Sequence, residues 1–144
     1  MKTKFTLSLT LSFLLFSHIA VGQAERTFVK SFNLLGKQKI VLNLGENVRI
    51  VPWDSELMRI QMTVSLSTTN DATLKALAET GRYTLKSEIK EQSFDISTPF
   101  LQNSLKLNGH ELAESIFYVI YAPKDAVIMN NGTLISNVLA KTKN

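Results

Sequence analysis

Few residues in this sequence have the type and spacing to support catalysis or metal binding. Glu114 follows His110 by four residues, a spacing that would place both side chains on one face of a helix. A metal site would need further ligands as well as that helix, and the preceding Asn108-Gly109 favours a turn instead. We therefore expect His110 to lie in a solvated loop, and we predict no metal site.

Two pairs of carboxylates could serve acid–base chemistry only if the fold set their separation. The pairs are Asp54 with Glu56 and Glu88 with Asp95. A Ser-His-acid triad would have to use His110, and the sequence has neither a nucleophile elbow nor a Gly-rich phosphate loop. We therefore predict no catalytic residues, no cofactor and no enzyme activity, and a hydrolase is the weakest functional alternative.

Aromatic residues are better candidates for binding. Trp53, the single tryptophan, follows Pro52 at an expected corner of the chain. It could cap the core with its N–H hydrogen-bonded, or it could be an exposed platform for a sugar ring or a partner. Tyr83, Tyr118 and Tyr121 carry the same two alternatives, so these four residues are the candidate contact residues.

Strands are the elements that must position these side chains. From Leu57 to Leu66 apolar residues alternate with polar ones, the period of a strand with one buried face, and such a strand needs other segments to cover it. Thr27 to Leu34, Lys39 to Leu44 and Val48 to Val51 precede it. Their spacing of about ten residues, with turn residues between, is typical of an antiparallel sheet.

One short helix is predicted near the middle of the chain. Asn70 and its polar neighbours can cap its start, apolar residues such as Leu74 and Leu77 recur at helical spacing, and Gly81 provides a stop. The helix should therefore run from about Asp71 to Thr80. We expect it to cover the core, and a lid over a ligand is the alternative.

The second half of the chain returns to strand patterns. Strands are expected over Arg82 to Ile89, at Phe94 to Ile96, and over Ser115 to Ala122, which is apolar on both faces and should be a central strand covered on both sides. Asn131-Gly132-Thr133 matches a glycosylation sequon but favours a hairpin turn. The predicted fold class is mainly β: a single antiparallel β-sandwich or flattened barrel with one short helix.

The first 22 residues have the pattern of an export signal. Lys2 and Lys4 precede an uncharged apolar run, and small residues surround Gly22. The run is shorter than the roughly 20 residues that a membrane-spanning helix needs, so we expect cleavage after Gly22 rather than a retained anchor. Residues 23–139 should then form one β-rich domain and residues 140–144 a solvated tail.

Composition excludes several classes of protein. The sequence contains no cysteine, which excludes a lipid anchor on cysteine, disulfides and thiolate metal sites. Without the two signal lysines the formal net charge falls from +4 to +2, and the charges are interspersed. Nucleic-acid binding needs a concentrated basic surface, so we do not expect it.

Short segments spread over the chain resemble a known group of proteins. The segments are Phe28 to Leu34, Val48 to Asp54, Leu57 to Val64, Gly81-Arg82-Tyr83, and Tyr121 to Asp125 followed by Asn131-Gly132. With these segments the chain resembles secreted β-rich proteins of Bacteroidetes-type bacteria, related to the adhesin-like families of unknown function. Those families continue through further strand–turn–strand repeats, and this chain resembles a short form without them. The resemblance implies an exported, β-rich, non-catalytic protein of the periplasm, the outer-membrane surface or the extracellular space.

These observations favour an exported, non-catalytic β-domain that acts as an envelope or adhesin-like interaction module. Its contacts with a protein or glycan surface would use exposed strand edges or the corner at Trp53. The alternative is a small carrier that holds an apolar or glycan ligand between sheet and helix, under Leu74 and Leu77.

Overall fold

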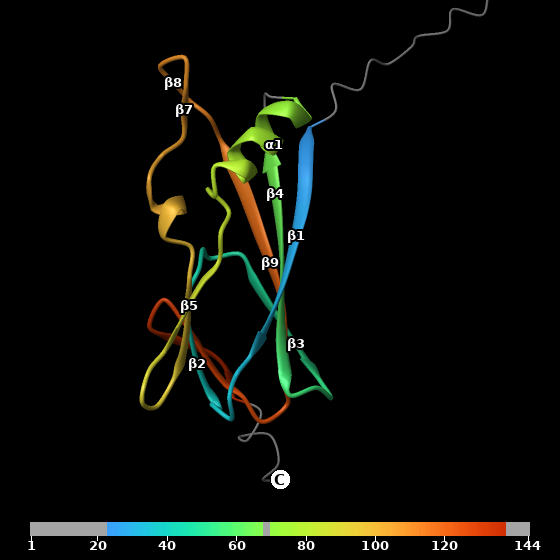
Figure 1. The fold of residues 1–144 in the computed structure, drawn as a ribbon, viewed down its shortest axis with the longest axis vertical. Helices are drawn as coiled ribbons and strands as arrows, with labels where there is room; N and C mark the ends of the chain where they lie inside the picture. The colour runs from blue at the N-terminus through green and yellow to red at the C-terminus, as the bar shows by residue number, and fades with distance from the viewer. Residues whose placement is uncertain (1–22, 68–69, 138–144) are drawn as a thin grey trace, which may run out of the picture.

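Two β-sheets face each other as a sandwich in the computed structural model, which describes residues 23–67 and 70–137 (Figure 1). The predicted signal segment and the predicted tail, residues 140–144, lie outside the described residues. The first sheet has the strand order β1 (Ala24–Asn33), β4 (Leu57–Leu66), β9 (Glu114–Pro123) and β3 (Val48–Trp53). The second has the order β11 (Thr133–Asn137), β10 (Val127–Asn130), β2 (Lys39–Asn43), β6 (Phe94–Ser97) and β5 (Lys86–Ile89). The mainly β class and the sandwich are as predicted.

The smaller elements lie toward one end of the sandwich. Helix α1 (Asp71–Glu79) lies at the upper ends of β1 and β4 in Figure 1. The short 3-10 helix η1 (Pro99–Gln102) leads to a small hairpin of β7 (Lys106–Leu107) and β8 (His110–Glu111). Within the described residues, no helix is long and apolar enough to cross a membrane.

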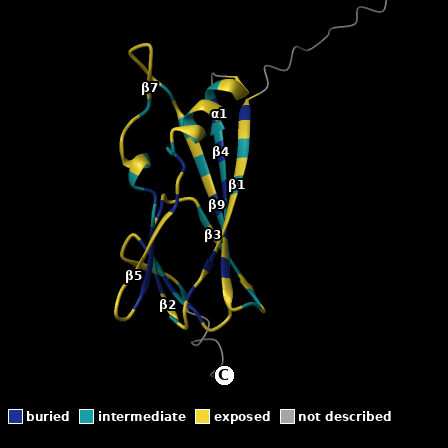
Figure 2. Cartoon of the chain, in the orientation of Figure 1, coloured by how far each residue is buried: buried dark blue, intermediate teal, exposed yellow. Residues whose placement is uncertain are grey.

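Strand β4 has the bounds that the alternating pattern predicts. Its inward side chains, Met58, Ile60, Met62, Val64 and Leu66, are all 0% exposed. They pack in one core with residues of the second sheet such as Ile40, Leu42, Ile96 and Ile128. Figure 2 shows the strands of the first sheet banded, because buried and more exposed residues alternate along them.

The prediction of purely antiparallel pairing is wrong, because both sheets are mixed. Strand β3 pairs in parallel with β9, and β2 pairs in parallel with both β10 and β6. The chain crosses from the first sheet to the second after β1 and returns after β2, so strands adjacent in sequence are often not partners. Regular turn spacing therefore indicates that strands form, but not which strands pair.

Two further expectations about strands are corrected. Pro52 does not end β3, which continues to Trp53, because β3 is an edge strand and can contain a residue without an N–H. Strand β9 does lie between two partners, but it is covered on one face only. Its outward side chains remain accessible, and Phe117 is 43% exposed.

Helix α1 begins and ends much as predicted, whereas the strand after it is shorter. The Asn70 side chain accepts a hydrogen bond from the backbone N–H of Thr73, and Gly81 has a positive φ of 84°. Residues 82–85 form a turn that buries Tyr83 and Leu85, and β5 begins only at Lys86, with every side chain exposed. The apolar alternation there reflects two inward residues of a turn rather than one face of a strand.

Three tight turns in the described part of the chain use positive φ at two successive residues. Asn108-Gly109 joins β7 to β8 and Asn131-Gly132 joins β10 to β11, as their sequences predict. The third turn joins β1 to β2 and has Leu35 (φ 51°) and Gly36 (φ 75°) at the same positions. A left-handed backbone costs about 1–2 kcal/mol for a residue with a Cβ, and asparagine tolerates it better than leucine.

A largely buried ion pair ties the turn after α1 to the first sheet. Arg82 Nε donates to Glu114 Oε1 over 2.9 Å, and Arg82 Nη2 lies 2.5 Å from Glu114 Oε2. The Tyr83 hydroxyl also donates to Glu114 Oε1, over 2.7 Å. Arg82 further donates to the carbonyl oxygens of Phe100 and Asn103, so one guanidinium holds η1, the turn and β9 together.

Candidate binding site

Three connections meet at the end of the sandwich opposite α1 (Figure 1). The pairing of Asn33 with Leu57 brings the end of β1 to the start of β4, and the pairing of Trp53 with Pro123 brings the end of β3 to the end of β9. The Val127 N–H donates to the Gln38 carbonyl oxygen over 2.8 Å, which joins the start of β10 to the start of β2. Strand register therefore places residues 33–38, 53–56 and 123–126 around one point.

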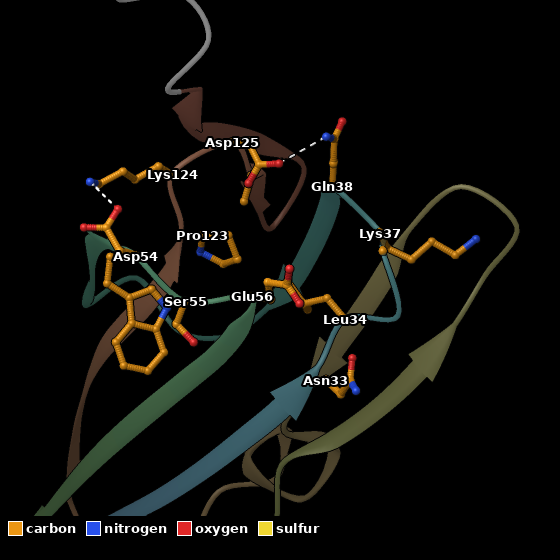
Figure 3. A pocket seen from close by; sticks show the side chains of 13 residues that line it. Asn33, Leu34, Lys37, Gln38, Asp54, Ser55, Glu56, Pro123, Lys124 and Asp125 are labelled. Atoms are coloured by element: carbon orange, nitrogen blue, oxygen red, sulfur yellow. Dashed lines mark hydrogen bonds and ion pairs between the residues drawn. The ribbon is translucent and has the colours of Figure 1, made fainter.

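These connections surround an open pocket of about 590 Å³, which we call the loop-end pocket (Figure 3). Side chains that can form hydrogen bonds make up much of its lining: Asn33, Gln38, Asp54, Ser55, Glu56, Lys124 and Asp125. Trp53, Leu34, Pro123 and Ala126 add apolar surface. This combination suits a ligand that has both polar groups and a flat apolar face.

Two contacts fix part of the lining. Lys124 Nζ lies 2.5 Å from Asp54 Oδ1, and Gln38 Nε2 donates to Asp125 Oδ2 over 3.1 Å. Figure 3 shows Lys37 directed away from the pocket, in agreement with its hydrogen bond to the carbonyl oxygen of Glu91. Glu56 lies between Leu34 and Pro123 in the same view, and it forms no ion pair within the described residues.

Trp53 lies on the outward face of the first sheet, at the rim of the loop-end pocket. It is partly exposed and does not cap the core, because its position in β3 puts it opposite Pro123 on the side away from the second sheet. Its indole N–H donates to the Leu57 carbonyl oxygen over 2.8 Å. The ring centroid lies 5.5 Å from that of Tyr121 and 5.1 Å from the Arg59 guanidinium carbon. The indole is therefore held in place and still accessible.

The other candidate contact residues divide into surface and core. Tyr121 is partly exposed beside Trp53, whereas Tyr83 and Tyr118 are 5% and 1% exposed. Tyr83 stacks on Phe28 with ring centroids 5.4 Å apart. Burial, which disfavours the charged phenolate, raises the pKa of both buried tyrosines. Tyr83 and Tyr118 therefore serve packing, and Trp53 with Tyr121 forms the accessible aromatic pair.

The residues considered for catalysis or metal binding are not assembled into one centre. His110 lies in the exposed β7–β8 hairpin, and Glu114 lies on β9, where it forms an ion pair with Arg82. The helix that would bring His110 and Glu114 to one face therefore does not form. Asp54 is paired with Lys124 and Asp95 with Lys90. Within the described residues, no three His, Asp or Glu side chains are close enough to hold a metal ion.

The environment of the Asp95 carboxylate leads to a prediction of how the stability of the fold depends on pH. Burial alone would raise the pKa of Asp95, but contacts from Lys90 Nζ at 2.5 Å and the Ser93 hydroxyl at 2.6 Å hold it below its usual value. The pair therefore stabilises the fold above the unfolded pKa of about 4, and that stability should be lost as the pH falls further. Urea unfolding measured from pH 7 to pH 3 should show a shallower acid loss for Asp95→Asn than for the wild type. The Glu46→Gln variant, which removes an exposed carboxylate outside this pair, should retain the wild-type slope, and equal slopes for all three proteins would contradict this prediction.

A second cleft, also of about 590 Å³, opens between the sheets near η1. Leu44, Leu101, Ile116 and Tyr118 supply its apolar lining, and Glu114 and Asn131 border it. The Asn131 side-chain amide donates to the Leu44 carbonyl oxygen over 2.6 Å, so the nitrogen that glycosylation would modify is engaged by the loop that follows β2. The predicted ligand space under Leu74 and Leu77 is instead core, since Leu74 is fully buried.

The loop-end residues Asn33, Gln38 and Asp125 were not predicted from the sequence. Each lies beside a turn marked by Gly36 or Pro123, and such strand-end polar residues are the signal that could have identified them. Their convergence depends on strand register and on the crossings between sheets, which local patterns do not contain.

Comparison with known proteins adds little to this geometry. No protein-family model and no curated protein matches the chain. Among solved structures, a proposed cell adhesion protein from Clostridium sporogenes is similar, with 16% sequence identity and a TM-score of 0.41. The match covers 74% of this chain and 45% of that chain, so this chain spans less than half the length of that protein. A similarity this weak assigns no function, and the resemblance to Bacteroidetes-type adhesin-like proteins stays a prediction.

Proposed function

We propose that the chain is an exported, non-catalytic binding module whose loop-end pocket holds a glycan. Trp53 would supply the platform on which one sugar ring packs, and the polar lining would supply partners for its hydroxyl groups. The interaction role is the one expected from the sequence, and the proposed binding site is the loop-end pocket at one end of the sandwich.

The geometry of Trp53 is the observation that carries this proposal. An exposed aromatic ring normally loses side-chain freedom when a ligand binds, and that loss weakens binding. Here the hydrogen bond to Leu57 and the contacts with Tyr121 and Arg59 already fix the ring. A fixed indole at the rim of a polar pocket is preorganised for a ligand with a flat apolar face and hydroxyl-bearing edges.

The arrangement of charges supports binding rather than bond cleavage. General acid–base catalysis needs a carboxyl group free to exchange a proton with the substrate. In the loop-end pocket, Asp54 is paired with Lys124 and Asp125 accepts a hydrogen bond from Gln38. Glu56 is the remaining lining carboxylate, and one free carboxylate does not supply the two carboxyl groups that glycoside hydrolysis normally uses. Carboxylates held in this way are suited to accept hydrogen bonds from sugar hydroxyls.

Removing the indole should weaken glycan binding about tenfold. An aromatic contact contributes on the order of 1.4 kcal/mol, which corresponds to a factor of ten in affinity. Fluorescently labelled wild-type protein and Trp53→Ala would be compared on a printed glycan array, with dilution series for every glycan retained. Far-ultraviolet circular dichroism of each protein would verify that the variant remains folded.

Phe117→Ala is the matched control for this test. Phe117 is an exposed aromatic residue on the outward face of the same sheet, and it does not line the loop-end pocket. Its removal should leave glycan binding unchanged. Equal loss in the two variants, or retention of the wild-type pattern by Trp53→Ala, would contradict the proposed site.

The cleft near η1 supports a second candidate function, a small carrier of an apolar or amphipathic ligand. Its apolar lining and its position between the sheets are the observations that favour it. Native mass spectrometry of freshly purified protein should then show a bound small molecule, lost in a Leu101→Glu variant. A wild-type mass equal to that of the chain alone would count against this candidate.

A further inference from the structure

Two Asn-Gly pairs form the tips of hairpins, Asn108-Gly109 between β7 and β8 and Asn131-Gly132 between β10 and β11. Their backbones are nearly the same, with φ of 50° and 80° in the first turn and 48° and 80° in the second. All four residues are exposed. The two turns therefore present the same chemical groups in the same conformation, and they differ in the contacts that hold them.

An asparagine followed by a glycine can react with its own backbone. The glycine nitrogen attacks the side-chain carbon Cγ of the asparagine, an imide ring closes, and the amide nitrogen leaves as ammonia with the proton that the glycine nitrogen gives up. Solvent water then opens the ring at either carbonyl, which leaves aspartate or isoaspartate. Glycine favours the attack because it has no side chain to hinder the approach. Contacts that fix the asparagine side chain or the turn therefore slow the reaction.

The contacts of Asn131 restrain both its side chain and its backbone. The side-chain amide donates to the Leu44 carbonyl oxygen over 2.6 Å, and the backbone N–H donates to the Leu42 carbonyl oxygen over 2.9 Å. The preceding strand, β10, lies inside the second sheet between β2 and β11. Movement of the Asn131 side chain toward the Gly132 nitrogen would break the contact with Leu44, and loosening the turn would disturb the sheet.

The turn at Asn108 has weaker support. Strands β7 and β8 have two residues each, form a separate small sheet, and have exposed side chains throughout. One further backbone hydrogen bond, from Leu112 N–H to the Leu105 carbonyl oxygen, closes the base of the hairpin, which stands apart from the two main sheets in Figure 1. A hairpin of this size is only marginally stable in water, so it opens locally more readily than a strand inside a sheet. Each opening frees the Asn108 side chain to approach Gly109.

We propose that Asn108 is a site of spontaneous deamidation in the folded protein, and that its hydrogen bonds protect Asn131. The product has a carboxylate at position 108 in place of a neutral amide, and therefore one additional negative charge two residues before His110. The hairpin lies toward the end of the sandwich that carries α1, opposite the loop-end pocket. This inference is therefore independent of the proposed function.

The test follows both asparagines over time in folded and in unfolded protein. Samples would be kept in mildly alkaline buffer with and without urea, and digested peptides would be resolved by mass spectrometry. In the folded protein, Asn108 should convert at least about tenfold faster than Asn131, because reaction at Asn131 must first break the bond to Leu44 and open a turn that the sheet supports. In urea the two residues should convert at similar rates. Equal rates in the folded protein, faster conversion of Asn131, or no conversion of Asn108 would overturn the inference.

Asn108→Gln is the matched variant for this experiment. Its longer side chain would have to close a larger ring, so conversion at position 108 should be lost, whereas conversion of Asn131 in urea should match the wild type. The hairpin is peripheral, and circular dichroism should show the wild-type spectrum. Isoaspartate among the wild-type products distinguishes ring closure from direct hydrolysis of the side chain. Aspartate alone at position 108 would contradict the proposed reaction.

Discussion

Glu114→Ala should lower the free energy of unfolding by about 3–5 kcal/mol, the range expected when one member of a buried ion pair is removed. Both side chains of the Arg82–Glu114 pair are 11% exposed. The variant would leave the Arg82 guanidinium largely buried without its carboxylate and would deprive the Tyr83 hydroxyl of its acceptor. Because Arg82 also binds the carbonyl oxygens of Phe100 and Asn103, we expect η1 to loosen from β9 as well.

Urea unfolding followed by circular dichroism would measure this loss. Glu111→Ala, which removes an exposed carboxylate three residues earlier in the chain, is the matched control and should change stability by less than about 0.5 kcal/mol. Replacing both Arg82 and Glu114 with leucine should cost less than Glu114→Ala alone, since no unpaired charge then remains buried. A loss below about 1 kcal/mol for Glu114→Ala would show that the pair is not the link between η1 and the first sheet.

Ile60→Ala should destabilise the protein by about 2–5 kcal/mol, the range for truncating a buried isoleucine to alanine. Ile60 is fully buried and pairs with Lys30 on one side and Ile120 on the other, so it lies at the centre of the sheet that carries the site. Strands on both sides limit how far the structure can collapse into the cavity, which favours the upper half of that range.

The control for the core prediction is on the same strand. Gln61→Ala removes the next side chain, which points to the outward face, and should change stability by about 0.5 kcal/mol or less. Thermal and urea unfolding of the two variants would compare the two faces of β4 directly. Similar losses for both would contradict the assignment of its faces.

The parts of the fold that depend on local pattern could be predicted from the sequence. Alternation from Leu57 to Leu66 predicted the bounds of β4 and its buried face, and Asn70 with Gly81 predicted both ends of α1. The Asn-Gly dipeptides predicted two turns. Each of these features is decided by residues within one element or one turn.

Features set by pairing between distant segments could not be predicted in the same way. The alternation in Tyr83 and Leu85 looked like a strand, although the Arg82–Glu114 contact and the stacking of Tyr83 on Phe28 of β1 hold this segment as a turn. The parallel partners of β2 and β3 follow from crossings between the sheets.

The candidate site shows the same division. Trp53 was identified as an unusual residue, but its outward position follows from its pairing with Pro123 across the sheet. The carboxylates Asp54 and Glu56 were considered as a catalytic pair, and the structure instead pairs Asp54 with Lys124 from a distant connection.

Nuclear magnetic resonance with a glycan retained on the array tests the central claim most directly. The single tryptophan gives one indole N–H signal, so its response to the glycan needs no further assignment. We predict that this signal shifts in proportion to the glycan added, together with the backbone amides of residues 33–38, 53–57 and 123–126. An unmoved indole signal, with shifts confined to residues around the η1 cleft, would contradict a glycan site at the loop end.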